Sequence, residues 1–375
     1  MSIRIKDDTG MQDSIRAKGK SMLNFSVGPV MTWNEILSIG GQQIPYFRTA
    51  EFSGIMKDNE RLMLDFSYAP DESRTVFLTG SGTMAMEVAV ASTLSNQDKA
   101  LIINGGSFGQ RFVNLCKLHG IPHDELKLDL GEALTTDLLD NYNPANYSTL
   151  IVNMHETSTG VLYDMDAIKK FCESGNLFLI VDAISAFLAD KLDMRTMGID
   201  VMITSSQKAL ACAPGISMLT LTPRAIERVK ANEYKNMYMD MRGALSNADR
   251  GQTPFTPAVS ILLQINKRLH MIEDNGGPKE EITRVHDVAT YFRSKIKNLP
   301  LEFVSKSQSN AVTCLHPTNM LARMLVDRLK NDYGIWVCPN GGEHADYMFR
   351  VGHIGNITNN DIDVLVDSLR RVILQ

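Results

Sequence analysis

The sequence has few of the features that define several protein classes. Its five cysteines are odd in number and widely dispersed, at Cys116, Cys172, Cys212, Cys314 and Cys338. They form neither the even, clustered pattern of a disulfide framework nor the paired spacing of a structural zinc site. No uncharged apolar run is long enough to span a bilayer, and the N-terminal residues lack the apolar core of a signal peptide. We therefore expect a reduced, cytoplasmic protein with no structural metal and no membrane partner.

Long stretches of one charge sign are also missing. The formal net charge is −5 over 375 residues, and both signs are spread along the chain. The absence of a basic tract argues against nucleic acid as a main partner. The chain has no internal repeat, and it lacks the Gly-x-x-x-x-Gly-Lys-Ser/Thr loop of many nucleotide-binding proteins. With 44% hydrophobic residues, a chain of this length can bury a large core in two or three domains.

Strand-like and helix-like runs alternate between residues 75 and 223. The expected strands are 75–78, 101–104, 149–154, 177–182 and 201–204. Amphipathic stretches such as 84–94 and 110–119 lie between them, with apolar residues at helical spacing. This alternation predicts a mostly parallel sheet with helices on both faces. Ligands of such sheets bind at the carboxyl ends of the strands, where polar motifs of this chain also lie.

The C-terminal third has a different organisation. After a loop that contains Pro254 and Pro257, two long helices are expected at 258–274 and 280–298. A smaller mixture of strands and helices follows. We predict an N-terminal segment (1–25), a large domain with the mostly parallel sheet (26–255) and a small C-terminal α/β domain (256–375).

Lys208 and Asp182 are the most informative residues. Lys208 follows the strand-like run 201–204, and Asp182 ends the apolar run 177–182. An amine and a carboxylate at the ends of buried strands are costly unless each has a partner. Pyridoxal 5'-phosphate (PLP) supplies both, an aldehyde for the lysine and a ring nitrogen for the aspartate. We predict a PLP enzyme in which Lys208 forms a Schiff base and moves protons, while Asp182 keeps the ring nitrogen protonated.

Four other features follow strands or interrupt them. Each could have a role at the cofactor or substrate, or only a structural role. The turn 80–83 (Gly-Ser-Gly-Thr) could bind a phosphate at a helix N-terminus, or it could be a capped tight turn. Phe108, flanked by glycines, could stack on the cofactor ring or belong to the core. The hydroxyls that begin at Thr157 could bond the phenolic oxygen of PLP or form a local turn. Arg350 could bind a substrate carboxylate in a planar fork, or it could form a buried ion pair.

Together these segments resemble the class V aminotransferases, the fold type I group that includes alanine–glyoxylate, serine–pyruvate and 2-aminoethylphosphonate transaminases. The resemblance extends from about Phe25 to Gly355. It rests on six ordered segments, 80–87, 104–111, 156–161, 181–185, 206–210 and 350–355. It implies the α/β architecture of fold type I, in which a large domain with a mostly parallel sheet flanked by helices carries a smaller C-terminal α/β domain.

The resemblance also implies roles for individual residues. The residues implied to bind the cofactor are Ser81, Gly82, Thr83, Phe108, Thr157, Asp182, Gln207, Lys208 and, from a neighbouring subunit, Thr253. Arg350 would bind the substrate carboxylate, and Gly28 would lie near the substrate mouth. The family is typically a homodimer with shared active sites, which is the arrangement expected here.

The chain departs from the family pattern in two places. Phe108 stands where several relatives have tryptophan, and His155-Glu156 lacks the glycine common between these two residues. Arg48 resembles an arginine near the family's active-site entrance, but no substrate group can be assigned to it.

We predict an aminotransferase that moves an amino group between an amino acid or aminophosphonate and a 2-oxo acid or aldehyde, through a pyridoxamine intermediate. A PLP-dependent lyase or desulfurase is the alternative on the same cofactor. A desulfurase needs a nucleophilic cysteine on a mobile loop, whereas Cys314 and Cys338 lie in or at the end of strand-like runs. A non-catalytic nucleotide-binding module would explain the glycine-rich turn but not Asp182 and Lys208.

Overall fold

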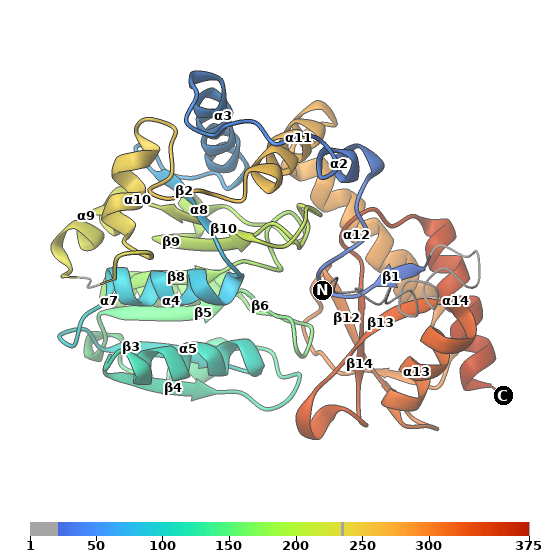
Figure 1. Ribbon diagram of the computed structural model, residues 1–375. Coiled ribbons are helices and arrows are strands. Elements are labelled where there is room, and N and C mark those ends of the chain that lie inside the picture. The colour runs from blue at the N-terminus through green and yellow to red at the C-terminus, as the bar shows by residue number, and fades with distance from the viewer. Residues whose placement is uncertain (1–21, 234–235, 375) are drawn as a thin grey trace, which may run out of the picture.

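Two sheets lie next to each other in the computed structural model, which describes residues 22–233 and 236–374 (Figure 1). The larger sheet of this described part has seven strands in the order β2-β10-β9-β8-β5-β3-β4. Its strands are β2 (Arg74–Thr79), β3 (Ala100–Asn104), β4 (His123–Lys127), β5 (Thr149–Asn153), β8 (Phe178–Asp182), β9 (Val201–Ser205) and β10 (Ile216–Leu221). β10 runs antiparallel to both of its neighbours, and the other neighbouring pairs are parallel. The predicted mostly parallel sheet is therefore confirmed.

Helices cover both faces of the large sheet because its central strands are buried along their whole length. Alternate strand residues pack into two separate apolar clusters, one on each face. The first face carries α4 (Gly82–Thr93), α5 (Ser107–Leu118), α9 (Pro223–Ala231) and α10 (Met241–Ala248). Against the second face lie α2 (Asn34–Ile39), α3 (Ala50–Phe66), α7 (Met165–Gly175), α8 (Met194–Met197) and α11 (Val259–Asp274), with α6 (Thr136–Leu139) beside α7.

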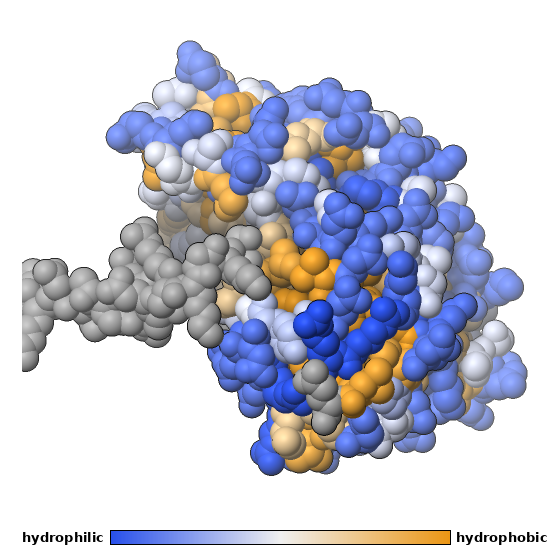
Figure 2. Space-filling model, turned by 90° about the vertical axis from the view of Figure 1, so that its right-hand side faces the viewer, coloured by the Kyte–Doolittle hydropathy of each residue, from blue (hydrophilic) through white to orange (hydrophobic). Residues whose placement is uncertain are grey.

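The smaller sheet has the strand order β1-β13-β14-β12-β11 among the described residues. Its strands are β1 (Leu23–Phe25), β11 (Leu301–Phe303), β12 (Val312–Pro317), β13 (Ile335–Pro339) and β14 (Phe349–Gly352). A third apolar cluster joins this sheet to α12 (Pro278–Lys295), α13 (Ala322–Tyr333) and α14 (Asn359–Ile373). The outer face of this region is mostly hydrophilic, with hydrophobic areas between the polar ones (Figure 2).

Two elements connect the parts of the chain. β1 lies near the N-terminus but pairs in parallel with β13 of the small sheet. α11 follows the proline-containing loop but packs against α2 and α3 beside the large sheet. The domain boundaries at residues 25 and 255 stay a prediction.

Short elements complete the connections. These are β6 (His155–Glu156), β7 (Val161–Leu162) and the 3₁₀ turns η1 (Pro144–Asn146) and η2 (Gly342–His344). In the part of the chain that the structure describes, no helix has the length and apolarity needed to cross a membrane. Nor does any group of three or more His, Cys, Asp or Glu side chains in these residues form a metal-binding arrangement.

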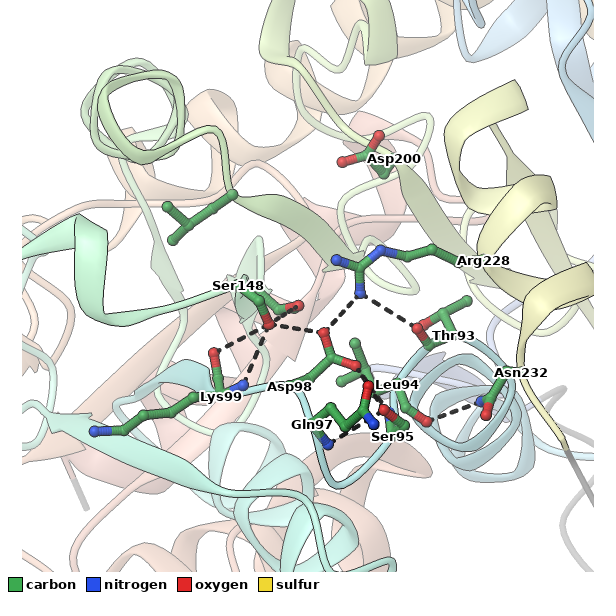
Figure 3. Close-up of polar contacts among 12 residues, drawn as sticks. Thr93, Leu94, Ser95, Gln97, Asp98, Lys99, Ser148, Asp200, Arg228 and Asn232 are labelled. Carbon is green, nitrogen blue, oxygen red and sulfur yellow. Dashed lines mark hydrogen bonds and ion pairs between the residues drawn. The ribbon is translucent and has the colours of Figure 1, made fainter.

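A polar network holds α9 against the end of α4, at the edge of the sheet where β3 and β5 begin (Figure 3). Asp98 Oδ1 accepts hydrogen bonds from Arg228 Nη1 at 3.0 Å and from Ser148 Oγ at 2.8 Å. Asp98 Oδ2 accepts from the Ser95 amide at 2.9 Å. Burial raises the pKa of the Asp98 carboxyl, but these hydrogen bonds and the charge of Arg228 outweigh burial and hold the pKa below its usual value.

Removing the negative charge of Asp98 should destabilise this junction. Because the folded pKa is depressed, the contribution of Asp98 is present above the unfolded pKa and is lost as the pH falls through the folded value. We expect Asp98→Asn to lower the free energy of unfolding by about 1–3 kcal/mol at pH 7. The difference from the wild type should narrow below about pH 4.

Urea unfolding at pH 7 and below about pH 4 measures this effect. Asp71→Asn is the matched control, because Asp71 forms an ion pair with Arg195 but its side chain is exposed. Equal stability of the Asp98 variant and the wild type at pH 7 would show that the network contributes nothing.

Candidate active site

Lys208 lies just beyond the carboxyl end of β9. Its Nζ donates a hydrogen bond of 2.6 Å to the carbonyl oxygen of Val27, which follows β1. Gly28 has φ +130°, and a Cβ at this position would lie 2.8 Å from Lys208 Cδ. The positive φ favours glycine at this position. Gly28 therefore touches the lysine that we predicted to carry the chemistry.

The surroundings of Lys208 favour a neutral amine. Burial lowers the pKa of the ammonium group to about 8, and the positive charge of Arg350 acts in the same direction. The carboxylate of Asp182 opposes this shift. At pH 8 about half of the Lys208 side chains therefore have the lone pair that a nucleophile or a base needs.

Asp182 ends β8, the strand next to β9, and only 5% of it is exposed. Burial raises the pKa of its carboxyl to about 6, although the hydrogen bond from the Ile184 amide acts against this rise. That bond joins Ile184 N to Asp182 Oδ1 at 2.8 Å. Among the described residues no donor bonds the second oxygen, Oδ2. The carboxylate stays mostly ionised at pH 7 with one oxygen available to a ligand.

The helices α4 and α5 each follow a strand of the large sheet, and they differ in whether the free amides at their N-termini have hydrogen-bond acceptors. At α5 the carboxylate of Glu156 accepts hydrogen bonds from the amides of Phe108 and Gly109, at 3.2 and 3.0 Å. At α4 the N-cap residue Ser81 makes no side-chain capping bond. The amides of Gly82 and Thr83 have no acceptor within the described residues. Because a helix N-terminus favours negative charge, α4 is left open to an anion, whereas α5 is already paired.

The predicted residues Thr83 and Phe108 lie close together and share a neighbour. Arg111 Nη1 donates a hydrogen bond of 2.7 Å to Thr83 Oγ1. The guanidinium carbon of Arg111 lies 4.7 Å from the centre of the Phe108 ring. The aromatic side chain is thus packed beside the open N-terminus of α4 rather than in the interior of a core.

Thr157 and Arg350 connect the two sheets. Arg350 Nη1 donates to the Thr157 carbonyl oxygen at 3.2 Å, and Nη2 donates to the Pro339 carbonyl oxygen at 2.8 Å. The Thr157 hydroxyl lies 2.6 Å from Ser185 Oγ. Arg350 contacts no carboxylate in the described part of the chain, so these residues do not form the buried ion pair that was the alternative for Arg350. The buried Nε of Arg350 has no hydrogen-bond partner in the described residues, so the guanidinium retains a donor for a ligand.

Gln207 lies next to Lys208 in the chain, whereas the contacts of Thr253 are with its own loop and with Arg48. The Gln207 amide oxygen accepts a hydrogen bond of 2.6 Å from Ser205 Oγ. The buried Thr253 hydroxyl instead donates to the Phe255 carbonyl oxygen at 2.7 Å. Arg48 holds this loop through the carbonyl oxygens of Thr253 and Pro254, at 3.1 and 3.2 Å. Arg48, unassigned from the sequence, therefore has a structural function in this chain, and a contribution of Thr253 to a neighbouring subunit stays a prediction.

Residues 45–365 match the family described as class-V aminotransferases. The chain belongs to this family. The assignment confirms the predicted aminotransferase class, and the family depends on PLP.

Relatives of this aminotransferase match it over most of their length. A protein named soluble hydrogenase, small subunit, from Synechococcus sp. is 29% identical over 95% of this chain and 94% of its own. An uncharacterized aminotransferase of Methanocaldococcus jannaschii is also 29% identical, over 88% of this chain and 86% of its own. The L-aspartate–glyoxylate aminotransferase of Paracoccus denitrificans is 24% identical over 77% and 75%.

Solved structures of aminotransferases share the fold. The alanine–glyoxylate aminotransferase of Nostoc sp. has a TM-score of 0.87 at 22% identity and covers 100% of both chains. The ureidoglycine–glyoxylate aminotransferase of Bacillus subtilis has a TM-score of 0.88 at 20% identity, covering 95% of this chain and 93% of its own. The predicted fold class, α/β of fold type I, is confirmed.

Three residues near the site of this aminotransferase were given no site role from the sequence. Glu156 is fully buried, and it accepts further hydrogen bonds from Asn153 Nδ2 at 2.9 Å and from Ser158. Arg111 contacts both Thr83 and Phe108. Cys338 lies opposite Arg350 in the β13–β14 pair. The available signal for Glu156 was a carboxylate two residues beyond the expected strand 149–154.

Proposed function

We propose that this aminotransferase binds PLP around Lys208 and transfers an amino group between an amino acid and a 2-oxo acid or aldehyde. When bound, PLP supplies the carbonyl that receives the amino group and the ring that stabilises negative charge at the substrate Cα. The observation that carries the proposal is the pairing of Lys208 and Asp182 at neighbouring strand ends, one with a depressed pKa and the other with an unpaired oxygen.

The residues present fit this cofactor. The unpaired N-terminus of α4 offers amides and hydroxyls to a phosphate, and Asp182 Oδ2 is available to a protonated ring nitrogen. The residues that would hold PLP are Ser81, Gly82, Thr83, Phe108, Thr157, Asp182, Gln207 and Lys208, with Thr253 from a second subunit of a homodimer. Glu156 would fix Phe108 in place by accepting a hydrogen bond from the backbone amide of Phe108.

Lys208 would perform the proton transfers. Because burial brings its pKa to about 8, Nζ can take a proton from the substrate Cα near neutral pH and return it to another carbon. Val27 would orient the amine through the hydrogen bond from Nζ to its carbonyl oxygen. The close approach of Gly28 leaves the lysine stem little room to move.

Arg350 would select substrates that carry a carboxylate. Its guanidinium is fixed by two carbonyl oxygens, and no protein carboxylate in the described residues competes for it. Relatives named for reactions of aspartate or alanine with glyoxylate agree with such substrates. An aminophosphonate donor, as in the name of a Clostridioides difficile relative, would meet Arg350 only through its oxo-acid partner.

The proposal also includes a cytoplasmic location for this aminotransferase.

The rate at which the apoprotein captures PLP tests the proposal. Only the neutral amine attacks the aldehyde, so the rate should rise about tenfold per pH unit below pH 8 and level off above it. Borohydride reduction and peptide mass analysis should then place the adduct on Lys208. An adduct on another lysine, or a rate that keeps rising to about pH 10 as for an exposed lysine, contradicts the assignment.

A further inference from the structure

We propose that Arg111 supplies the positive charge that neutralises the phosphate of PLP, an inference that rests on the proposed function. The predicted phosphate ligands are Ser81, Gly82, Thr83, Gln207 and Thr253, and none of these side chains carries a charge. A phosphate group carries roughly −1.5 to −2 charges at neutral pH and binds arginine forks strongly. A site built from these five residues alone leaves that charge unbalanced.

The position of Arg111 places a guanidinium at the open end of α4. Its Nη1 donates to Thr83 Oγ1 at 2.7 Å, and Thr83 is the second residue of α4. The amides of Gly82 and Thr83, which have no acceptor in the described residues, begin the same turn. The remaining N–H groups of Arg111 form no hydrogen bond within the described chain, so they can reach phosphate oxygens.

Arg111 also has no negative partner of its own. Other arginines on the large-sheet side, such as Arg74, Arg224 and Arg228, form ion pairs with carboxylates. Within the described residues no carboxylate lies in ion-pair distance of Arg111. A fixed guanidinium without an anion, next to a helix N-terminus without an anion, makes one site for a ligand that carries negative charge.

The guanidinium is held in place by Phe108. It lies over the Phe108 ring at 4.7 Å, and the backbone of Phe108 is itself fixed by Glu156. Burial dominates the pKa values of Lys208 and Asp182, but the charge of Arg111 contributes a lowering of both. The charge of Arg111 therefore acts on the two groups on which the chemistry depends. Arg111 would couple the residue that stacks on the ring to the residues that bind the phosphate.

Binding of PLP and of pyridoxal, which lacks the phosphate, separates this role from packing. The apoprotein is titrated with each compound, and the dissociation constants are obtained from the visible absorbance. We expect Arg111→Gln to weaken PLP binding about 10- to 100-fold, and pyridoxal binding less than about threefold. Arg111→Lys should fall between the wild type and Arg111→Gln for PLP, because it keeps the charge but loses the fork. Arg195→Gln is the matched control, since Arg195 pairs with Asp71 at an exposed position.

Two results with the Arg111→Gln variant would overturn the inference. Equal weakening of PLP and pyridoxal would mean that Arg111 acts only by packing against Phe108. Unchanged binding of PLP by a folded Arg111→Gln variant would remove Arg111 from the site. If that variant fails to fold, an Arg111→Lys variant whose preference for PLP over pyridoxal equals that of the wild type overturns the inference in the same way. Failure of the wild type to bind PLP at all would instead contradict the proposed function.

Discussion

Replacement of Lys208 by alanine should abolish amino transfer while the protein stays folded. We expect turnover to fall by at least about 10³-fold, because the variant loses both the nucleophile and the group that moves the proton. The stability should change little, since the Nζ of Lys208 bonds a single carbonyl oxygen and a neutral cavity lined by Gly28 would remain. Initial rates with saturating donor and acceptor, and thermal unfolding of the apoprotein, measure the two effects.

The exposed Lys306 provides the control for this variant. It pairs with Glu132 at the surface, so Lys306→Ala should keep normal turnover. Near-normal transamination by Lys208→Ala would contradict the assigned role of this lysine. A loss of folding would instead show that the buried amine is a structural requirement of the loop that follows β9.

The Asp182→Asn substitution should keep the shape of the site but remove its chemistry. The side-chain oxygen can still accept from the Ile184 amide, but the charge that would keep a ring nitrogen protonated is gone. We expect turnover to fall about 10²- to 10⁴-fold, with a smaller effect on substrate affinity. Steady-state kinetics with one donor–acceptor pair give both parameters.

Asp190 offers a closely matched comparison for Asp182. Both side chains are buried, and burial raises the pKa of each carboxyl to about 6. Both oxygens of Asp190 are already bonded, by Ser309 Oγ at 2.6 Å and the Asn310 amide at 2.8 Å. Asp190→Asn should therefore lower the free energy of unfolding while changing turnover little. If the two variants lose turnover equally, the charge of Asp182 has no special role in the reaction.

The sequence predicted the large sheet well because burial leaves a direct trace in it. The runs at 149–154, 177–182 and 201–204 are mostly apolar, and they form β5, β8 and β9 within one residue at each end. The pairing of β1 with β13 left no such trace. A three-residue strand is too short to show a period, and its partner lies more than 300 residues away in sequence.

Residues at strand ends were easier to predict than residues on helices. Lys208 and Asp182 could be inferred because charged side chains are costly at the ends of buried strands. Arg111 could not, because its contacts with Thr83 and Phe108 depend on how α5 lies beside α4. The contact between Lys208 and Gly28 joins two segments far apart in sequence, and periodicity carries no information about it. The roles of these residues toward PLP stay predictions.

The most direct test of amino transfer is a single half-reaction. The protein is reconstituted with PLP and mixed with a panel of amino donors without any acceptor, and the released oxo acid and ammonia are measured. We predict about one equivalent of oxo acid per subunit for a competent donor and no ammonia, because the amino group stays on the enzyme. Continuing release of ammonia would indicate a lyase, and no oxo acid from any donor would contradict the assignment of Lys208 and Asp182.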